Sequence, residues 1–348
     1  MLPPSPVPSL PSLPWLGRVT PVLFGPTASG KSALAVALAQ HIVRAGGPAP
    51  VILAADAFQI YRGMDIGTAK PPPDERAGFA HDLIDLVSPH DPTPFTVEDW
   101  LARADARLAE LRAAGTPAIV VGGTGLYVQA LLYGLFAGPP ADPALRAELH
   151  ALGPEALRAR LLAIDPEAAA RIHPADLRRT VRALEVHTLT GYPITALQQQ
   201  WARDARPRPG LAVCVLNPPK ETLSPRINAR VKAMFAAGLV DEVAALLRVG
   251  PLATQPAEAL GYKQLIPAVS AALAANRWPP RPGEVDDARE QIKILTRRFA
   301  KNQRTWLNRL GSTPVSVTLP PEPPAPDTLP AHLLAVCAAC QASTPGQA

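Results

Sequence analysis

Short apolar runs alternate with amphipathic stretches through the first third of the chain. Apolar runs at Val19–Phe24, Val51–Ala55 and Pro117–Val121 predict three short buried strands. Between them, Ser32–Val43 is rich in the good helix formers Ala and Leu, and Val97–Ala114 places apolar residues at helical spacing. This alternation predicts an α/β fold, with a P-loop-type parallel sheet flanked by helices.

The pattern changes after the third strand. Residues 126–205 show helical periodicity with no evident strand, so we predict a helical insertion domain there. The α/β core is then formed by 17–125 and 206–311, and Leu211–Leu216 supplies a further strand. Two long helices are predicted in the second part of this core, at Arg226–Val249 and Arg289–Leu310.

Prolines interrupt both ends of the chain. Residues 1–16 have no basic region followed by an apolar core, and their prolines prevent a helix, so we predict a disordered arm and no signal peptide. Residues 312–348 are rich in Pro and Ala and predict a loosely ordered tail. No apolar run approaches the length that spans a membrane, and together these features favour the cytoplasm.

The most specific motif directly follows the first strand, at Gly25, Pro26, Thr27, Ala28, Ser29, Gly30, Lys31 and Ser32. It fits G-x-x-x-x-G-K-[ST], whose backbone N–H groups wrap a phosphate chain while the next helix directs its positive dipole end at the anion. Lys31 adds a positive charge, and the Ser32 hydroxyl is a candidate ligand for Mg²⁺. Nucleoside triphosphates are the usual ligands, so a kinase or NTPase is the first interpretation.

Polar residues also follow the next two strands. Asp56 comes directly after the second strand, and Thr124 lies in a glycine-rich turn after the third. Because ligands of such sheets gather beyond the carboxyl ends of the strands, we expect Gly25, Asp56 and Thr124 to converge on one site. A carboxylate there can hold Mg²⁺ or accept a proton, although an ordinary turn or helix-cap Asp is the alternative.

Positive charge is unevenly distributed over the 348 residues, whose net charge is only +5. One face of the last predicted helix carries cations at i, i+4 spacing, at Arg289, Lys293, Arg297 and Lys301. Glu290 is the only acid between Arg289 and Arg309, which favours contact with a polyphosphate backbone over a merely solvated face. A second basic cluster, Arg178, Arg179 and Arg182, lies in the helical insertion.

The cysteines do not indicate a metal site. Cys214, Cys337 and Cys340 are too few for a disulfide framework. Cys337 and Cys340 form one C-x-x-C pair, but a zinc site needs about four ligands and the sequence offers no second pair. We therefore expect the pair to bind nothing.

Several segments together resemble the tRNA dimethylallyltransferases, the isopentenyltransferases of tRNA. In chain order these are the phosphate loop, Asp56–Pro71, Gly122–Tyr127, Arg171–Asp176 with Arg182–Glu185, Gly261–Gln264 and Thr296–Trp306. The resemblance covers about residues 19–311. Its second and third segments are specific to the family, whereas the phosphate loop alone is not.

The resemblance implies that the loop binds dimethylallyl diphosphate, with Mg²⁺ offsetting its charge, and that the five-carbon group moves to N6 of adenine 37 beside the tRNA anticodon. The product is N6-dimethylallyladenosine. Asp56 corresponds to the family's general base, which takes a proton from the adenine amine. Thr124 corresponds to a threonine placed near the bridging oxygen of the leaving group. The target base must leave its stack to reach such a site.

The resemblance and the basic helix together predict the contacts with tRNA. Gln59 corresponds to a residue that holds the extruded adenine edge. The expected contacts are Ala57, Phe58, Gln59, Arg146, Arg178, Arg179, Arg182, Gly261, Tyr262, Lys263, Gln264, Arg297 and Lys301. Two residues depart from the family pattern: Ala57 replaces a common Ser, and Lys263 replaces an Arg, keeping the charge but losing the guanidinium fork.

Other functions stay open at this point. An adenylate isopentenyltransferase acting on free AMP or ATP uses the same chemistry, although the helical insertion and the basic helix favour a macromolecular acceptor. If the protein is a P-loop kinase or NTPase, it should turn over ATP. If it is a non-catalytic RNA-binding module, the phosphate loop has no role. The expected partners are therefore the tRNA anticodon stem-loop and dimethylallyl diphosphate, with no membrane. Nothing demands a dimer, so we expect a monomer.

Overall fold

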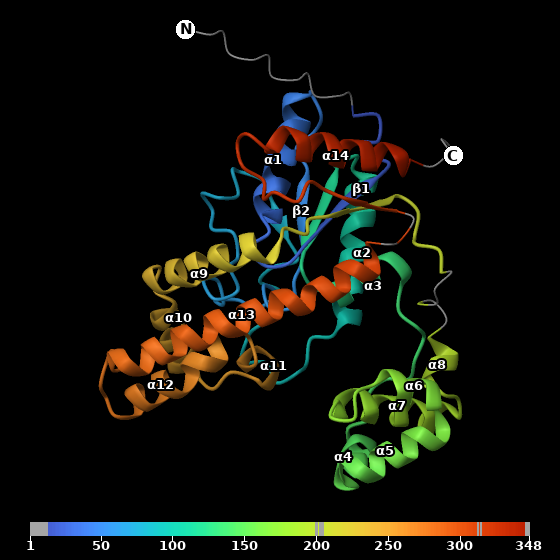
Figure 1. Ribbon diagram of the computed structural model, residues 1–348, viewed down its shortest axis with the longest axis vertical. Coiled ribbons are helices and arrows are strands. Elements are labelled where there is room, and N and C mark those ends of the chain that lie inside the picture. The colour runs from blue at the N-terminus through green and yellow to red at the C-terminus, as the bar shows by residue number, and fades with distance from the viewer. Residues whose placement is uncertain (1–12, 199–200, 202–204, 312, 314, 345–348) are drawn as a thin grey trace. The chain divides into compact units, whose positions relative to one another are not determined.

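A computed structural model describes residues 13–198, 201, 205–311, 313 and 315–344. Contacts divide the chain into two units (Figure 1). The first contains the described residues up to Leu132 and those from Pro207 onward, and the second spans Tyr133–Arg206.

The first unit is built on a parallel sheet, as the sequence predicts. In the described part of the chain it has six strands in the order β3-β2-β4-β1-β5-β6. Their bounds are β1 (Thr20–Phe24), β2 (Val51–Ala55), β3 (His81–Asp82), β4 (Ala118–Gly122), β5 (Leu211–Val215) and β6 (Ser316–Thr318). Phe24 and Ala55 both lie opposite Gly122, so β1, β2 and β4 end at one level. Their carboxyl ends therefore deliver the following loops to the same edge.

Helices pack around this sheet and extend beyond it (Figure 1). They are α1 (Lys31–Arg44), α2 (Val97–Ala113), α3 (Gly125–Tyr133), α9 (Lys220–Ala236), α10 (Leu239–Val249), α11 (Thr254–Ala257), α12 (Tyr262–Ala274), α13 (Pro282–Leu310) and α14 (Leu329–Ala342). α9 packs against α13, and α12 packs against both α10 and α13. The single helix predicted at Arg226–Val249 is wrong, because Gly238, with a φ of 96°, separates α9 from α10.

The described residues near both ends of the chain are better ordered than their composition predicts. Residues 1–12 of the expected arm lie outside the description, but Trp15 is buried in the core. The loosely ordered tail predicted at 312–348 is wrong for most of its described residues, because β6 pairs with β5 and α14 packs against α1. Residues 312, 314 and 345–348 of the tail lie outside the description.

An apolar face explains the order of the tail. Leu333 and Val336 of α14 are buried against the core, and all three cysteines lie in the same cluster. Burial raises the pKa of Cys214 to about 12 and that of Cys337 to about 11. These thiols therefore stay protonated at neutral pH and pack as small apolar groups.

The second unit is helical. It contains α4 (Pro143–Ala151), α5 (Gly153–Ile164), α6 (Pro166–Arg171), α7 (Leu177–Thr190) and α8 (Ile194–Leu197). Asp142, Asp165 and Asp176 cap α4, α6 and α7, as expected for acceptor side chains at helix N-termini. The unit starts later than the predicted boundary at 126, because α3 belongs mainly to the first unit, where Tyr127 stacks on Trp100.

The helices were also compared with the requirements for membrane insertion. Among the described residues, none is both long enough and apolar enough to cross a bilayer. The longest, α13, has 29 residues and carries charged side chains along its length.

Candidate active site

The phosphate loop connects β1 to α1 and depends on two glycines. A Cβ on Gly25 would lie 2.7 Å from the carbonyl oxygen of Leu216, so the close approach of these backbones excludes a larger residue. Gly30 has a φ of 93° and forms the N-cap of α1 without a side-chain cap. The loop thus begins α1 with backbone N–H groups available to an anion.

Gln303 of α13 holds this loop against the turn that follows β4. The backbone N–H of Thr27 donates to Gln303 Oε1 at 2.9 Å, and Gln303 Nε2 donates to the Gly123 carbonyl at 2.9 Å. The side chain is almost fully buried, with 6% exposed. A single buried amide therefore sets the spacing between the phosphate loop and the loop that carries Thr124.

Cations surround the loop. Arg230 of α9 donates to Thr27 Oγ1 at 3.1 Å, and Arg226 donates to the Ala28 carbonyl at 2.9 Å. Burial and the nearby Arg230 lower the pKa of Lys31 to about 8, although Asp56 partly offsets this. Burial likewise lowers the pKa of Arg230. Desolvated cations that repel one another beside a single carboxylate form a site that an anion stabilises.

Asp56 and Thr124 come together at the carboxyl edge of the sheet, as their positions after β2 and β4 predict. Asp56 Oδ1 accepts from the N–H groups of Phe58 at 2.9 Å and Gln59 at 3.3 Å. Thr124 Oγ1 accepts from the N–H of Ala57 at 3.2 Å. Because Thr124 Oγ1 is the acceptor in this hydrogen bond, its O–H is left to donate to a ligand.

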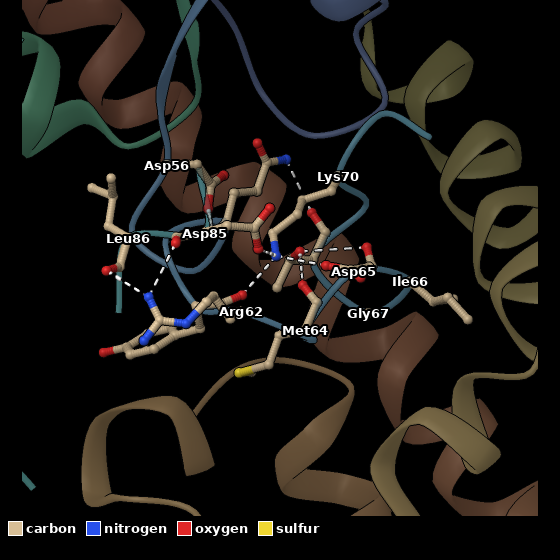
Figure 2. A network of polar contacts seen from close by, with 12 residues as sticks. Asp56, Arg62, Met64, Asp65, Ile66, Gly67, Lys70, Asp85 and Leu86 are labelled. Carbon is tan, nitrogen blue, oxygen red and sulfur yellow. Dashed lines mark hydrogen bonds and ion pairs between the residues drawn. The ribbon is translucent and has the colours of Figure 1, made fainter. Parts of the chain in front are cut away.

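A buried lysine organises the segment after Asp56 (Figure 2). Lys70 Nζ lies 2.6 Å from Asp65 and 2.5 Å from Asp85, and it also donates to the Tyr61 carbonyl. The segment 61–70 therefore folds around one ammonium group. Near the end of this segment, Gln59 Nε2 donates to the carbonyls of Thr68 and Ala69, both at 3.2 Å.

These loops enclose a cavity of about 330 Å³. Its polar lining residues include Thr27, Lys31, Ser32, Asp56, Gln59, Thr124 and Arg230. Its apolar lining residues include Ile227, Val231, Met234, Leu260 and Ile292, which come from α9, α13 and the loop before α12. The cavity suits a small ligand with a charged head and a short hydrocarbon part.

The Gly261–Gln264 segment is partly buried. Tyr262 is fully buried, because its ring packs on Gly67, so its prediction as a direct tRNA contact is corrected. Gln264 Oε1 accepts from the N–H of Gly261, which lines the cavity. Lys263 is exposed and pairs with Glu258.

Several cations on the basic face of α13 have partners within the protein that its sequence does not predict. Arg289 and Lys293 pair with the acids Asp286 and Glu290 one turn earlier on the helix. Arg297 donates to Asn228 Oδ1 at 2.6 Å. Lys301 is exposed. Exposed positive charge is thus concentrated toward the C-terminal half of the helix, where Arg298 is also exposed.

The second unit contains a buried carboxylate with two arginine partners. Glu185 accepts from Arg146 at 2.8 and 2.9 Å and from Arg182 at 2.6 Å. Burial opposes ionisation, but the hydrogen bonds from these arginines keep the pKa of Glu185 below its usual range. Arg146 and Arg182 therefore support the fold of this unit, whereas Arg178 and Arg179 are exposed.

The oxygen donors fit the Mg²⁺ expected from the sequence. Ser32 lines the cavity together with Asp56. The described residues contain no group of three or more His, Cys, Asp or Glu side chains that could hold a metal. Mg²⁺ commonly keeps several waters and binds through one or two protein oxygens plus substrate phosphates, so this donor set matches a phosphate-dependent site.

Comparison with known proteins identifies the family. A family model described as IPP transferase matches residues 59–310. This chain belongs to the IPP transferase family. The match spans well over half of the chain and includes the second unit, α13 and the part of the cavity lining that begins at Gln59. It also confirms the resemblance drawn from the motifs.

Relatives support the assignment over most of the chain. The tRNA dimethylallyltransferase of Myxococcus xanthus (strain DK1622) is 43% identical over 292 residues, which cover 83% of this chain and 89% of that protein. The tRNA dimethylallyltransferase of Geobacillus kaustophilus (strain HTA426) is 42% identical over 290 residues, covering 82% and 86%.

Solved structures agree with the fold. The full-length tRNA isopentenylpyrophosphate transferase from Bacillus halodurans matches with a TM-score of 0.62 and 32% identity, covering 94% of this chain and 98% of that one. A eukaryotic dimethylallyltransferase acting on tRNA matches with a TM-score of 0.70, covering 88% of this chain and 74% of that one. Its identity is 23%, so this likeness supports the fold alone.

Gln303 and Arg230 were not predicted individually as residues of this IPP transferase site. Gln303 lies within Thr296–Trp306, which the resemblance identifies only as a segment. Arg230 follows Arg226 at i, i+4 spacing, and that was its only signal in the sequence. Both side chains contact the phosphate loop from distant parts of the chain, and single-sequence periodicity does not report such pairings.

Proposed function

We propose that this IPP transferase moves the dimethylallyl group of dimethylallyl diphosphate to N6 of adenine 37 in tRNA. The observation that carries the proposal is the cavity, which joins a phosphate loop, a carboxylate and a hydroxyl to an apolar wall. The names of the relatives, tRNA dimethylallyltransferase, support the same donor and acceptor.

The donor occupies this cavity. Its diphosphate lies at the N-terminus of α1, where Lys31 and Arg230 offset the negative charge. Its five-carbon chain lies against the apolar wall. Ser32 is the residue that would hold Mg²⁺, which when bound offsets further charge on the diphosphate.

The chemistry follows from the positions of Asp56 and Thr124. The amine of adenine is a poor nucleophile, because its lone pair is delocalised into the ring. As the N6–carbon bond forms, the carbon–oxygen bond to the diphosphate breaks and its electron pair leaves with that oxygen. The amine proton passes to the Asp56 carboxylate, which is expected to contribute about 10²–10⁴-fold to the rate. The Thr124 hydroxyl donates to the oxygen on which charge develops.

The acceptor is the anticodon stem-loop, from which the target base must be extruded to enter the cavity. Gln59 lies beside Asp56 and contacts the edge of that base. Exposed cations contact the phosphate backbone, with Arg178 and Arg179 in the second unit and Lys301 on α13. We place this monomeric enzyme in the cytoplasm, where its tRNA substrate is found.

Free-nucleotide and kinase activities are less well supported. An adenylate isopentenyltransferase needs no surface for a polynucleotide, and a kinase needs no apolar wall beside its phosphate loop. The relatives named above are tRNA-modifying enzymes, so neither alternative is favoured by the comparisons.

One assay tests the proposal. The protein is incubated with Mg²⁺, labelled dimethylallyl diphosphate and unmodified tRNA, and the same tRNA with guanine at position 37 serves as the control. Parallel reactions replace the tRNA with AMP or with ATP. Label is expected in the adenine-containing tRNA alone. Label on AMP, or ATP hydrolysis without prenyl transfer, would overturn the proposal in favour of one of the alternatives.

A further inference from the structure

Glu242 binds a loop that it does not adjoin in sequence. This residue lies in the first turn of α10, and its carboxylate accepts three consecutive backbone N–H groups. These are the N–H of Asp65 at 2.9 Å, Ile66 at 2.7 Å and Gly67 at 3.1 Å. Hydrogen bonds to an ionised acceptor are about twice as strong as neutral ones, so this contact fixes the backbone of 65–67 firmly.

Tyr262 of α12 contacts both Glu242 and the loop. Its hydroxyl donates to Glu242 Oε1 at 2.5 Å, and its ring lies directly over Gly67. A Cβ on Gly67 would lie 2.4 Å from the ring, so glycine is required for this packing. The loop is therefore held by a carboxylate at its amides and by an aromatic ring at its Cα.

The loop in turn fixes the side chain of Gln59. Both Thr68 O and Ala69 O accept from Gln59 Nε2. Carbonyl oxygens can only accept, so the amide cannot be reversed without losing both bonds. Its Oε1 is left as the free polar atom. Gln59, like Asp56 beside it, thus offers the cavity an acceptor and not a donor.

We propose that Glu242 is a positioning residue for the acceptor base, acting through the 65–69 loop on the orientation of Gln59. An acceptor-only edge favours a base with an amino group at this position, because a base without N–H leaves both acceptors unpaired. The inference rests on the proposed function, and it adds a residue of α10 that does not touch the substrate.

A second anchor makes this role separable from folding. Lys70 forms ion pairs with Asp65 within the segment and with Asp85 outside it (Figure 2). Arg62 also donates to the carbonyls of Asp85 and Leu86. Removing the Glu242 carboxylate therefore frees the amides of 65–67 while the rest of the segment stays attached to the core.

The test compares two stem-loops that differ only at the target base, one with adenine and one with unsubstituted purine, which lacks the 6-amino group. Fluorescence anisotropy gives the ratio of their dissociation constants in the presence of pyrophosphate. We expect wild-type protein to bind the adenine stem-loop about 10-fold more tightly. In Glu242→Ala the two dissociation constants should differ by no more than about 2-fold. In Glu242→Gln the ratio should lie between the wild-type and Glu242→Ala values.

The ratio separates positioning from a general structural defect, because partial unfolding lowers the active fraction equally for both stem-loops. Asp241→Asn removes the same charge from an exposed position in the same helical turn and should keep the wild-type ratio. Pyrophosphate affinity should be unchanged in all variants. If Glu242→Ala does not fold, Tyr262→Phe, which loses only the hydroxyl, should still lower the ratio about 2- to 3-fold.

Each failure has a distinct meaning. A Glu242→Ala protein that folds and keeps the wild-type ratio would overturn this inference while leaving prenyl transfer intact. A wild-type ratio near one would also overturn it, because Gln59 would then not distinguish a base with an amino group from one without. Absence of prenyl transfer by the wild-type protein would instead overturn the proposed function.

Discussion

Removing the Gln303 side chain tests how the phosphate loop is supported. Gln303→Ala deletes the acceptor for the Thr27 N–H and the donor to the Gly123 carbonyl, each at 2.9 Å. A buried polar group left without a partner costs about 1–3 kcal/mol. The cavity allows water to reach part of the gap, so we take the low end for each group and expect about 2 kcal/mol in total.

This cost should appear as weaker anion binding, because the loop must be ordered before it can wrap a diphosphate. A loss of about 2 kcal/mol corresponds to roughly a 30-fold higher dissociation constant for pyrophosphate. Isothermal titration calorimetry measures it directly. Gln303→Glu should bind still more weakly, since its second oxygen would face the Gly123 carbonyl and add negative charge near the anion. Thr305→Ala, at an exposed position of the same helix, is the control.

The reasoning would be refuted by a folded Gln303→Ala protein that binds pyrophosphate as tightly as the wild type. That result would mean that the loop keeps its conformation without the bridge. An equal loss in Thr305→Ala would instead assign the effect to α13 as a whole.

Three further predictions concern the tail, the loop lysine and the basic helix. Leu333→Ala should lower the free energy of unfolding by about 2–4 kcal/mol, because the side chain is buried in the core. Leu334→Ala, at the exposed neighbouring position, should lower it far less. Chemical denaturation measures the free energy of unfolding of both variants. Because the pKa of Lys31 is about 8, pyrophosphate affinity should fall as the pH rises above 8 and this lysine loses its proton. The Lys31→Arg variant keeps its charge and should not show this fall. Identical pH profiles for the two proteins would contradict the assignment of the fall to Lys31. Lys301→Ala should reduce the slope of log affinity for tRNA against log salt by about 0.7–0.9, and an unchanged slope would remove Lys301 from the tRNA surface.

The sheet and the centre of the site were predictable, because they depend on local patterns. Apolar runs mark β1, β2 and β4 to within about one residue at either end. Parallel pairing then requires that Gly25, Asp56 and Thr124 emerge at one edge. The family motifs added the chemistry, which periodicity alone does not provide.

Tertiary pairing accounts for what was missed. The tail appeared disordered because its Pro and Ala content hides the apolar face of α14, which is stable only against α1 and β5. Arg146 and Arg182 are predicted tRNA contacts, and their shared ion pair with Glu185, whose side-chain exposure is 0%, was not predicted. Tyr262 was expected at the RNA surface, but its ring covers Gly67. The partners of α14, Arg146 and Tyr262 are distant in sequence and could not be identified by spacing, whereas Arg182 precedes Glu185 by only three residues.

The central claim is that Asp56 removes the proton from the adenine amine while the diphosphate leaves. A single-turnover experiment with saturating labelled dimethylallyl diphosphate and tRNA compares wild-type protein with Asp56→Asn, which keeps the size and removes the base. We predict a rate of label transfer about 10²–10⁴-fold lower, with the affinities for pyrophosphate and tRNA nearly unchanged. A transfer rate equal to that of the wild type would contradict the account.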